Sequence, residues 1–132
     1  MSLNVADTSG NVATLDGATR SDYQRNGKMV WISMEIHITS LSGMTSTDEV
    51  RIIGLPYAHP AGTDEHDTGC ITGTAFNGLN YTDISVFSIP STTTCHIRGT
   101  RFVNSANAPV LVSDLSTGSL RCLLGYFIET GA

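Results

Sequence analysis

The sequence predicts an all-β protein, folded as an antiparallel β-sandwich with a jelly roll as the preferred arrangement. The first observation is the segment from residue 28 to 38, where Val30, Ile32, Met34, Ile36 and Ile38 fall on every second position. That is the period of a strand. The second is a series of short strand-like segments separated by turn residues. The third is that no apolar stripe with the 3.6-residue period of a helix extends past a Gly, Pro or Ser/Thr cluster.

The strands are expected within a single β-sandwich domain that spans residues 1–132. Residues 1–22 should form an extended polar lead-in, and Asn26-Gly27 supplies the turn before the first long strand. If the opening Met1-Ser2-Leu3 is an expression remnant, a larger parent has a segment upstream. The strands predicted along the chain cover residues 28–39, 48–53, 70–76, 84–89, 95–103, 109–113 and 120–128.

Two of the predicted strands carry large side chains on both faces. Opposite the apolar row of the first strand stand Trp31, Glu35 and His37, and the last strand places Leu123 and Phe127 opposite its own apolar row. Contiguous exposed apolar groups are typical of contact surfaces. We therefore predict that these five residues contribute to an oligomer interface.

Charged residues are scarce and net negative. They make up 14% of the chain, against about a quarter in an average soluble domain, and the net charge is −5. The bases are scattered, so nucleic acid is not an expected partner. No apolar run approaches the roughly 18 residues that a membrane span needs, so membrane insertion is not expected either. Such a weakly charged, hydroxyl-rich chain favours an extracellular or virion module over a typical cytosolic enzyme.

The cysteines predict no disulfide framework. Cys70, Cys95 and Cys122 cannot all pair within one chain, and none belongs to a Cys-x-x-Cys unit. All three fall in predicted strands, where a free cysteine commonly acts as a small buried apolar residue. We expect reduced, buried thiols.

Four pieces of the chain, in order, resemble a module at the C-terminal end of many phage tail fibre and tail-associated proteins. They are residues 23–30 (YQRNGKMV), 41–43 (LSG), 50–57 (VRIIGLPY) and 124–128 (LGYFI). The Gly-Leu-Pro-Tyr element after an amphipathic strand is the most specific piece, and together the four span nearly the whole chain. The chain differs from the family pattern in having Asn-Gly-Lys where Gly-Asn is common, and in a longer acidic loop after Pro60.

The resemblance implies a small, TNF-like jelly-roll module that forms a homotrimer at the end of a virion fibre. The module would cap the trimer or attach the virion to a host-surface glycan. Its implied partners are other copies of the chain, other virion proteins and that glycan, and its implied location is the virion, after synthesis in the host cytoplasm. Two alternatives stay open: a capsid or tail decoration protein with a purely structural role, and a small carbohydrate-active enzyme domain.

The candidate ligand-binding residues are aromatic or polar side chains in or beside predicted loops. They are Tyr57, His59, Asp64, His66 and Tyr81. Loops on a rigid sandwich commonly carry binding residues, and an exposed aromatic ring can stack on a sugar or anchor an interface. Packing in the core or at an interface is the commoner role for such tyrosines, and Tyr57 and Tyr81, flanked by turn residues, are the ones most expected to be exposed.

No cofactor, metal site or catalytic residue is predicted. His37 and His66 are the weak metal candidates: around a three-fold axis His37 and Glu35 could ligate an ion, or they could make an inter-subunit hydrogen bond. No nucleophile elbow, phosphate-binding glycine loop or His-Glu-x-x-His run occurs. Asp48 and Glu49 point to opposite faces of a strand, which disfavours a two-carboxylate site. We therefore expect a protein that is not an enzyme.

Overall fold

The computed structural model describes residues 2–59, 68–76, 81–101 and 107–128, and these form an antiparallel all-β fold, as the sequence predicts. The strands are β1 (Asn4–Ala6), β2 (Thr14–Leu15), β3 (Arg20–Asn26), β4 (Met29–Ser40), β5 (Arg51–Ile53), β6 (Thr68–Thr72), β7 (Tyr81–Ser88), β8 (Cys95–Arg101), β9 (Asn107–Pro109) and β10 (Gly118–Phe127). Two short 3-10 turns, η1 (Thr74–Phe76) and η2 (Val112–Asp114), complete the described elements. Within these ranges, no helix has the length and apolarity needed to cross a membrane.

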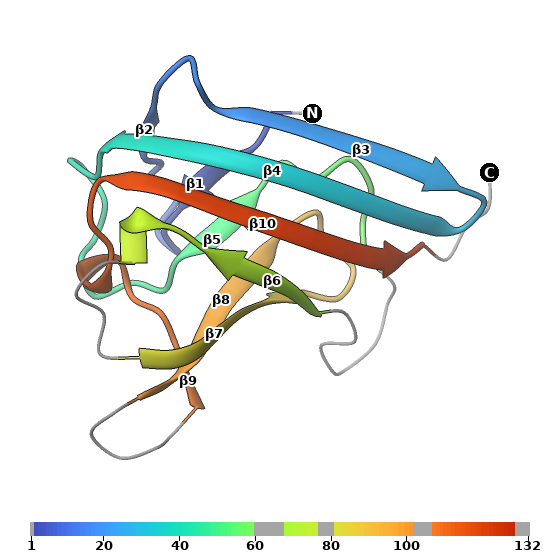
Figure 1. The fold of residues 1–132 in the computed structure, drawn as a ribbon. Coiled ribbons are helices and arrows are strands. Elements are labelled where there is room, and N and C mark those ends of the chain that lie inside the picture. Colours follow the sequence, from blue (N-terminus) through green and yellow to red (C-terminus); the bar gives the residue numbers. More distant parts are fainter. Residues whose placement is uncertain (1, 60–67, 77–80, 102–106, 129–132) are drawn as a thin grey trace.

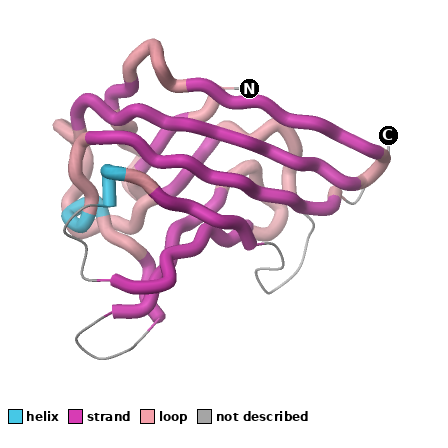
Figure 2. Tube along the Cα trace, in the orientation of Figure 1, coloured by secondary structure: helices cyan, strands magenta, loops and turns pink. Residues whose placement is uncertain are grey.

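One hydrogen-bonded sheet runs through the strands in the order β1-β5-β8-β7-β6-β10-β4-β2, with β3 paired to β4 and β9 paired to β8. The sheet curls so that β1, β5 and β8 lie behind β4 and β10 (Figure 1, Figure 2). A bridge between Ala6 and Val12 joins the segment before β2 back to β1. The sheet is therefore nearly closed and sandwich-like, with the hydrophobic core between its two halves.

The long pair of β4 and β10 forms the centre of the front half. The two strands pair without a break along the whole of β10. Every second residue of β4, from Val30 to Ile38, is buried, which confirms the alternating pattern in the sequence. On β10 the fully buried Tyr126 donates its hydroxyl hydrogen to the carbonyl oxygen of Tyr57 at 2.7 Å. This bond ties the end of β10 to the segment after β5.

The structure corrects the expectation for residues 1–22. These residues contribute β1, β2 and the start of β3, and Val5, Ala6 and Ala13 belong to the buried set. Two of these strands are too short to show a period. The third, β3, pairs only with β4 and exposes most of its side chains, so it carries no alternating apolar pattern. The hairpin to β4 turns at Gly27, whose φ of +61° suits glycine.

The predicted strands at residues 70–76 and 109–113 are each partly replaced by a 3-10 turn. After β6, Gly73 has a φ of +145°, and a β carbon there would collide with the backbone oxygen of Ser119. Before η2, the Asp114 carboxylate accepts hydrogen bonds from the Leu111 N–H and the Tyr81 hydroxyl, both at 3.0 Å. Close backbone approach and side-chain bonding therefore end these strands early.

Two of the three cysteines match the prediction. Cys95 and Cys122 are buried and form no disulfide, and burial, followed by the nearby Cys70, raises the pKa of Cys122 to about 12. Cys70 is exposed, which contradicts the prediction for that residue. Its place on β6 opposite Leu123 puts it on the side of the sheet that faces away from the core.

Candidate functional site

The candidate site is the side of β3, β4, β10 and β6 that faces away from the core, here called the outer face. Side chains alternate along a strand, so the neighbours of the buried β4 residues point outward. Strand pairing then arranges the outer face in rows across β3, β4 and β10: Gln24–Trp31–Gly125, Asp22–Ser33–Leu123 and Arg20–Glu35–Arg121. The outer face thus has an apolar half and a polar half.

Three large apolar side chains make up the apolar half, here called the apolar strip. Trp31 is 50% exposed, Leu123 is 54% exposed and Phe127 is 60% exposed. Among the described residues only two further large apolar side chains are classed as exposed, Val12 and Tyr23. The strip is therefore the main concentration of exposed apolar groups in the described part of the chain.

Gly125 lets the indole of Trp31 lie against the sheet. A β carbon on Gly125 would fall 2.5 Å from Cζ3 and 2.6 Å from Cε3 of Trp31, and 3.1 Å from Cε of Met29. The two distances to the indole are too short for a β carbon, so the indole would have to move. The indole consequently lies over the backbone of β10 with its other side open to solvent.

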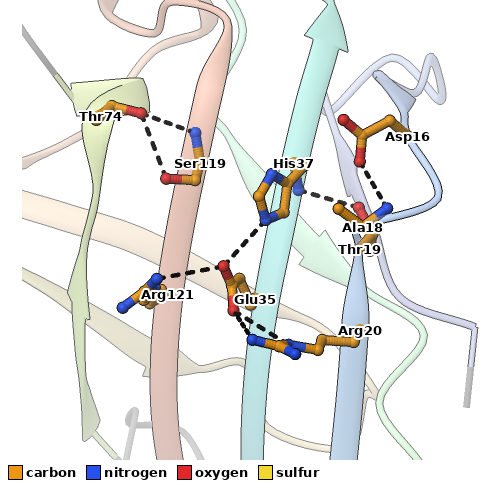
Figure 3. A network of polar contacts seen from close by, with 9 residues as sticks. All are labelled: Asp16, Ala18, Thr19, Arg20, Glu35, His37, Thr74, Ser119 and Arg121. Carbon is orange, nitrogen blue, oxygen red and sulfur yellow. Dashed lines mark hydrogen bonds and ion pairs between the residues drawn. The ribbon is translucent and has the colours of Figure 1, made fainter.

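A carboxylate holds the polar half together (Figure 3). Arg20 donates from Nε and Nη2 to Oε2 of Glu35 at 3.2 and 2.8 Å, and Arg121 donates from Nη2 to Oε1 at 3.3 Å. Nε2 of His37 lies 3.0 Å from Oε1. The hydrogen bond from Arg20, then that from His37, lowers the pKa of Glu35 to about 2. Glu35 is therefore ionised throughout the neutral range.

Further hydrogen bonds extend this network toward both neighbouring elements. On one side the backbone N–H of His37 donates to Oγ1 of Thr19 at 3.0 Å, and on the other the N–H of Ser119 donates to Oγ1 of Thr74 at 2.9 Å (Figure 3). The segment before β3 and the turn η1 are thereby fixed to the polar half.

A hollow of about 570 Å³ opens on the outer face between the two halves. Its lining includes Arg20, Asp22, Ser33, Glu35, Arg121 and Leu123. The small side chain of Ser33 is among the groups that line the hollow, next to Glu35 on the same face of β4. Cys70 and Thr72 of β6 form its far side.

The five predicted interface residues gather on this one face. Trp31, Leu123 and Phe127 are exposed together, whereas Glu35 and His37 are partly buried and bind each other. Within one chain Glu35 is bound by Arg20, His37 and Arg121, and the inter-subunit bond or metal ring of Glu35 and His37 stays a prediction. No cluster of three metal-ligating side chains occurs within the described ranges.

The described ligand candidates, Tyr57, His59 and Tyr81, do not line the hollow. His59 and Tyr81 are 3% and 6% exposed, too buried for surface contact with a ligand. Tyr57 is half-buried, with the Tyr23 ring 5.9 Å away and the Arg25 guanidinium 5.0 Å from its ring centre. Asp64 and His66 lie outside the described residues.

His59 belongs to the core beside β8 and β10. Its Nε2 lies 3.4 Å from Sγ of Cys95, and its ring packs edge-on against Tyr126 at 4.3 Å between ring centres. Burial lowers the pKa of His59 to about 4, so the ring is neutral near pH 7. Its role is one of packing.

Several outer-face residues were not predicted from the sequence. Arg20 and Arg121 lie 15 and 86 residues from Glu35, and only strand pairing brings them together. Ser33 lies on the same face of β4 as Trp31 and Glu35, and its small size becomes relevant only next to its neighbours on the sheet. Comparisons with protein-family models, curated proteins and solved structures each found no match.

Proposed function

We propose that this chain is a non-enzymatic phage virion module, a homotrimeric tail fibre tip or tail-associated domain that caps a trimer and attaches to a host-surface glycan. The observation that carries the proposal is the apolar strip of Trp31, Leu123 and Phe127 on the outer face. The resemblance in the sequence supplies the virion context, and the partners are other copies of the chain and other virion proteins.

Covering the strip favours assembly by a useful amount. An aromatic side chain buries about 150–250 Å² when fully covered. The exposed half of Trp31 therefore corresponds to about 100 Å², worth about 2–3 kcal/mol on burial. Phe127 adds a similar amount. Glu35 in the polar half already has hydrogen-bond partners within its own chain. Contact with a second copy therefore stabilises the assembly mainly by burying the apolar strip.

A closed ring of three is the assembly that the resemblance implies. In a three-fold ring each contact joins two different surfaces, so the outer face of one copy meets another part of the next. Three copies also present any ligand site three times, which strengthens weak attachment through avidity.

Light scattering of the purified chain tests the assembly. We expect a mass three times the 14.0 kDa of one chain, and we expect Trp31→Glu and Phe127→Glu to reduce it to the monomer mass. Tyr23→Glu is the matched control, because Tyr23 is also an exposed aromatic residue but lies off the strip. A monomeric wild-type protein at micromolar concentration would overturn the proposal.

A purely structural role, as a capsid or tail decoration protein, is the second candidate. It is favoured by the burial of His59 and Tyr81, which leaves neither ring exposed for contact with a ligand. Binding of the trimer to a glycan array would distinguish attachment from this structural role.

A further inference from the structure

We propose that residues 54–59 form a strap that is closed at neutral pH and opens in mild acid, with His59 as the group that senses the pH. The strap follows β5 and belongs to no strand of the sheet. The inference stands on the contacts of this segment and does not depend on the proposed function.

Gly54 is the hinge at which the strap begins. Its φ of +87° lies in the region that favours glycine, and a β carbon there would collide with the backbone oxygen of Ser2. On the other side of the hinge, β5 is held in the sheet by pairing with both β1 and β8. The strap can therefore move while β5 stays in place.

Backbone hydrogen bonds attach the strap to the turn between β7 and β8. The N–H of Leu55 donates to the carbonyl oxygen of Thr93 at 3.1 Å, and the N–H of His59 donates to that of Thr92 at 2.8 Å. Ser91 donates from its N–H to the carbonyl oxygen of His59 at 3.2 Å. A segment held by a few such bonds outside a strand ladder opens at a lower free energy than the whole fold.

The imidazole of His59 is the part of the strap that enters the core, and it is 3% exposed. Its Nε2 lies 3.4 Å from Sγ of Cys95 on β8, and its ring centre lies 4.3 Å from that of Tyr126 on β10. The Tyr126 hydroxyl also donates to the carbonyl oxygen of Tyr57 at 2.7 Å. Closing the strap therefore takes the imidazole out of water and packs it against two strands.

In the described part of the chain, the groups that face the imidazole include no carboxylate. The Cys95 thiol faces it from β8, the Tyr126 phenol from β10, and the backbone of Thr94 from the turn. On the β3 side of the strap the charged group is Arg25, whose guanidinium lies 5.0 Å from the centre of the Tyr57 ring. An imidazolium in the closed strap is therefore buried without a counter-ion, which is costly.

Mild acid consequently favours the open strap. Burial lowers the pKa of His59 from 6.5 to about 4, although the hydrogen bond to Thr94 acts in the opposite direction. The closed strap thus has its full stability above pH 6.5 and loses it as the pH falls toward 4, because the open form takes up the proton first. Between pH 7 and pH 5 the equilibrium constant for opening should rise about twentyfold.

Amide hydrogen exchange of the wild-type protein at pH 7 and pH 5, corrected for intrinsic rates, tests the inference. The amides of Leu55, His59 and Ser91 report on the strap, and those of β4 report on global unfolding. We expect the strap amides to open at a lower free energy than the β4 amides, with little dependence on low urea concentrations. Their opening constants should show the twentyfold rise at pH 5.

Two variants separate the pH sensor from the bonds that close the strap. His59→Phe keeps a buried ring and removes the titrating group, so we expect the same opening constant at both pH values. Tyr126→Phe is the matched control, because it removes the hydroxyl bond to Tyr57 and keeps the ring. It should raise the opening constant about fivefold at both pH values and leave the ratio between them unchanged.

Three results would overturn the inference. Strap amides that exchange only together with the β4 amides would show that the segment opens by global unfolding alone. A wild-type opening constant that is equal at pH 7 and pH 5 would show that no proton is taken up on opening. A pH dependence that persists in His59→Phe would assign the proton to another group. These readouts are independent of the mass of the assembly, so the trimer is tested separately.

Discussion

Trp31 of β4 and Gly125 of β10 are directly paired across the two strands, and the indole occupies the space that a β carbon on residue 125 would need. The absence of a side chain at Gly125 therefore sets how the Trp31 indole lies on the outer face. Because the indole is half exposed, it can move aside if that space is filled.

Gly125→Ala should displace the indole with little cost to folding. The clashing atoms belong to the far end of an exposed side chain, so we expect the free energy of unfolding to change by less than about 1 kcal/mol. We expect the trimer to weaken, because the strip loses its shape. Urea unfolding measures the first effect and light scattering the second.

Gly69→Ala is the contrasting variant. There a β carbon would lie 2.5 Å from the backbone oxygen of Leu123 and 2.8 Å from Cγ1 of Val86, neither of which can move freely. We expect a clear loss of folding stability. If Gly125→Ala is the more destabilising of the two, the indole is held more firmly than we infer.

Asp7→Asn should destabilise the turn that closes the sheet. The Asp7 carboxylate accepts hydrogen bonds from the N–H groups of Ser9, Asn11 and Thr45 and from the Asn11 side chain, at 2.7 to 2.9 Å. An amide would point two hydrogens at these donors. The urea midpoint should fall, whereas Asp16→Asn, in an exposed turn with one such bond, should change it little.

The pH dependence of the Asp7 effect has a defined direction. Burial alone would raise the pKa of Asp7, but the hydrogen bonds from Thr45, Asn11 and Ser9 outweigh it and lower the pKa from 3.8 to about 2. A lowered pKa stabilises the fold above pH 3.8, and this stabilisation is lost as pH falls to about 2. A wild-type carboxyl resonance of Asp7 that titrates near 3.8 would contradict the account.

His59 should make the fold less stable in mild acid. Its pKa falls from 6.5 in the unfolded chain to about 4 in the fold because the ring is buried. Between these values the unfolded chain takes up a proton that the folded chain does not, so stability is full above pH 6.5 and declines as pH falls. The loss over the whole window is about 3 kcal/mol.

His59→Phe removes the titrating group and keeps a ring against Tyr126. We expect its free energy of unfolding to depend less on pH between 6.5 and 5 than that of the wild type, as measured by urea unfolding at both values. Equal slopes for the two proteins would show that the His59 ring is accessible to protons in the fold.

The sequence predicts β4 and β10 well because both are long and half-buried, so their apolar residues alternate. It does not predict β3 as a strand, because an edge strand in water has no apolar period to detect. It places Trp31, Leu123 and Phe127 on the strand faces opposite the buried rows. It does not predict that β4 and β10 are neighbours in the sheet, which brings these three side chains together. Strand order and register are therefore needed to predict the hollow beside Ser33 and the binding of Arg20 and Arg121 to Glu35.

The sequence does not indicate that His59 is buried, and for Tyr81 it allows core packing without showing the partner. Both stand close to turn residues, which favours exposure in general. His59 packs instead on Tyr126, and the Tyr81 hydroxyl donates to the carboxylate of Asp114 at 3.0 Å. These are contacts between distant segments, and local composition carries no sign of them.

Quenching of Trp31 fluorescence by acrylamide tests most directly whether other copies cover the outer face. The chain has a single tryptophan, so the signal comes from Trp31 alone, which is 50% exposed in one copy. We expect quenching to decrease as protein concentration rises through the range in which the trimer forms. Quenching that stays the same while the trimer forms would place the interface elsewhere and contradict the central claim.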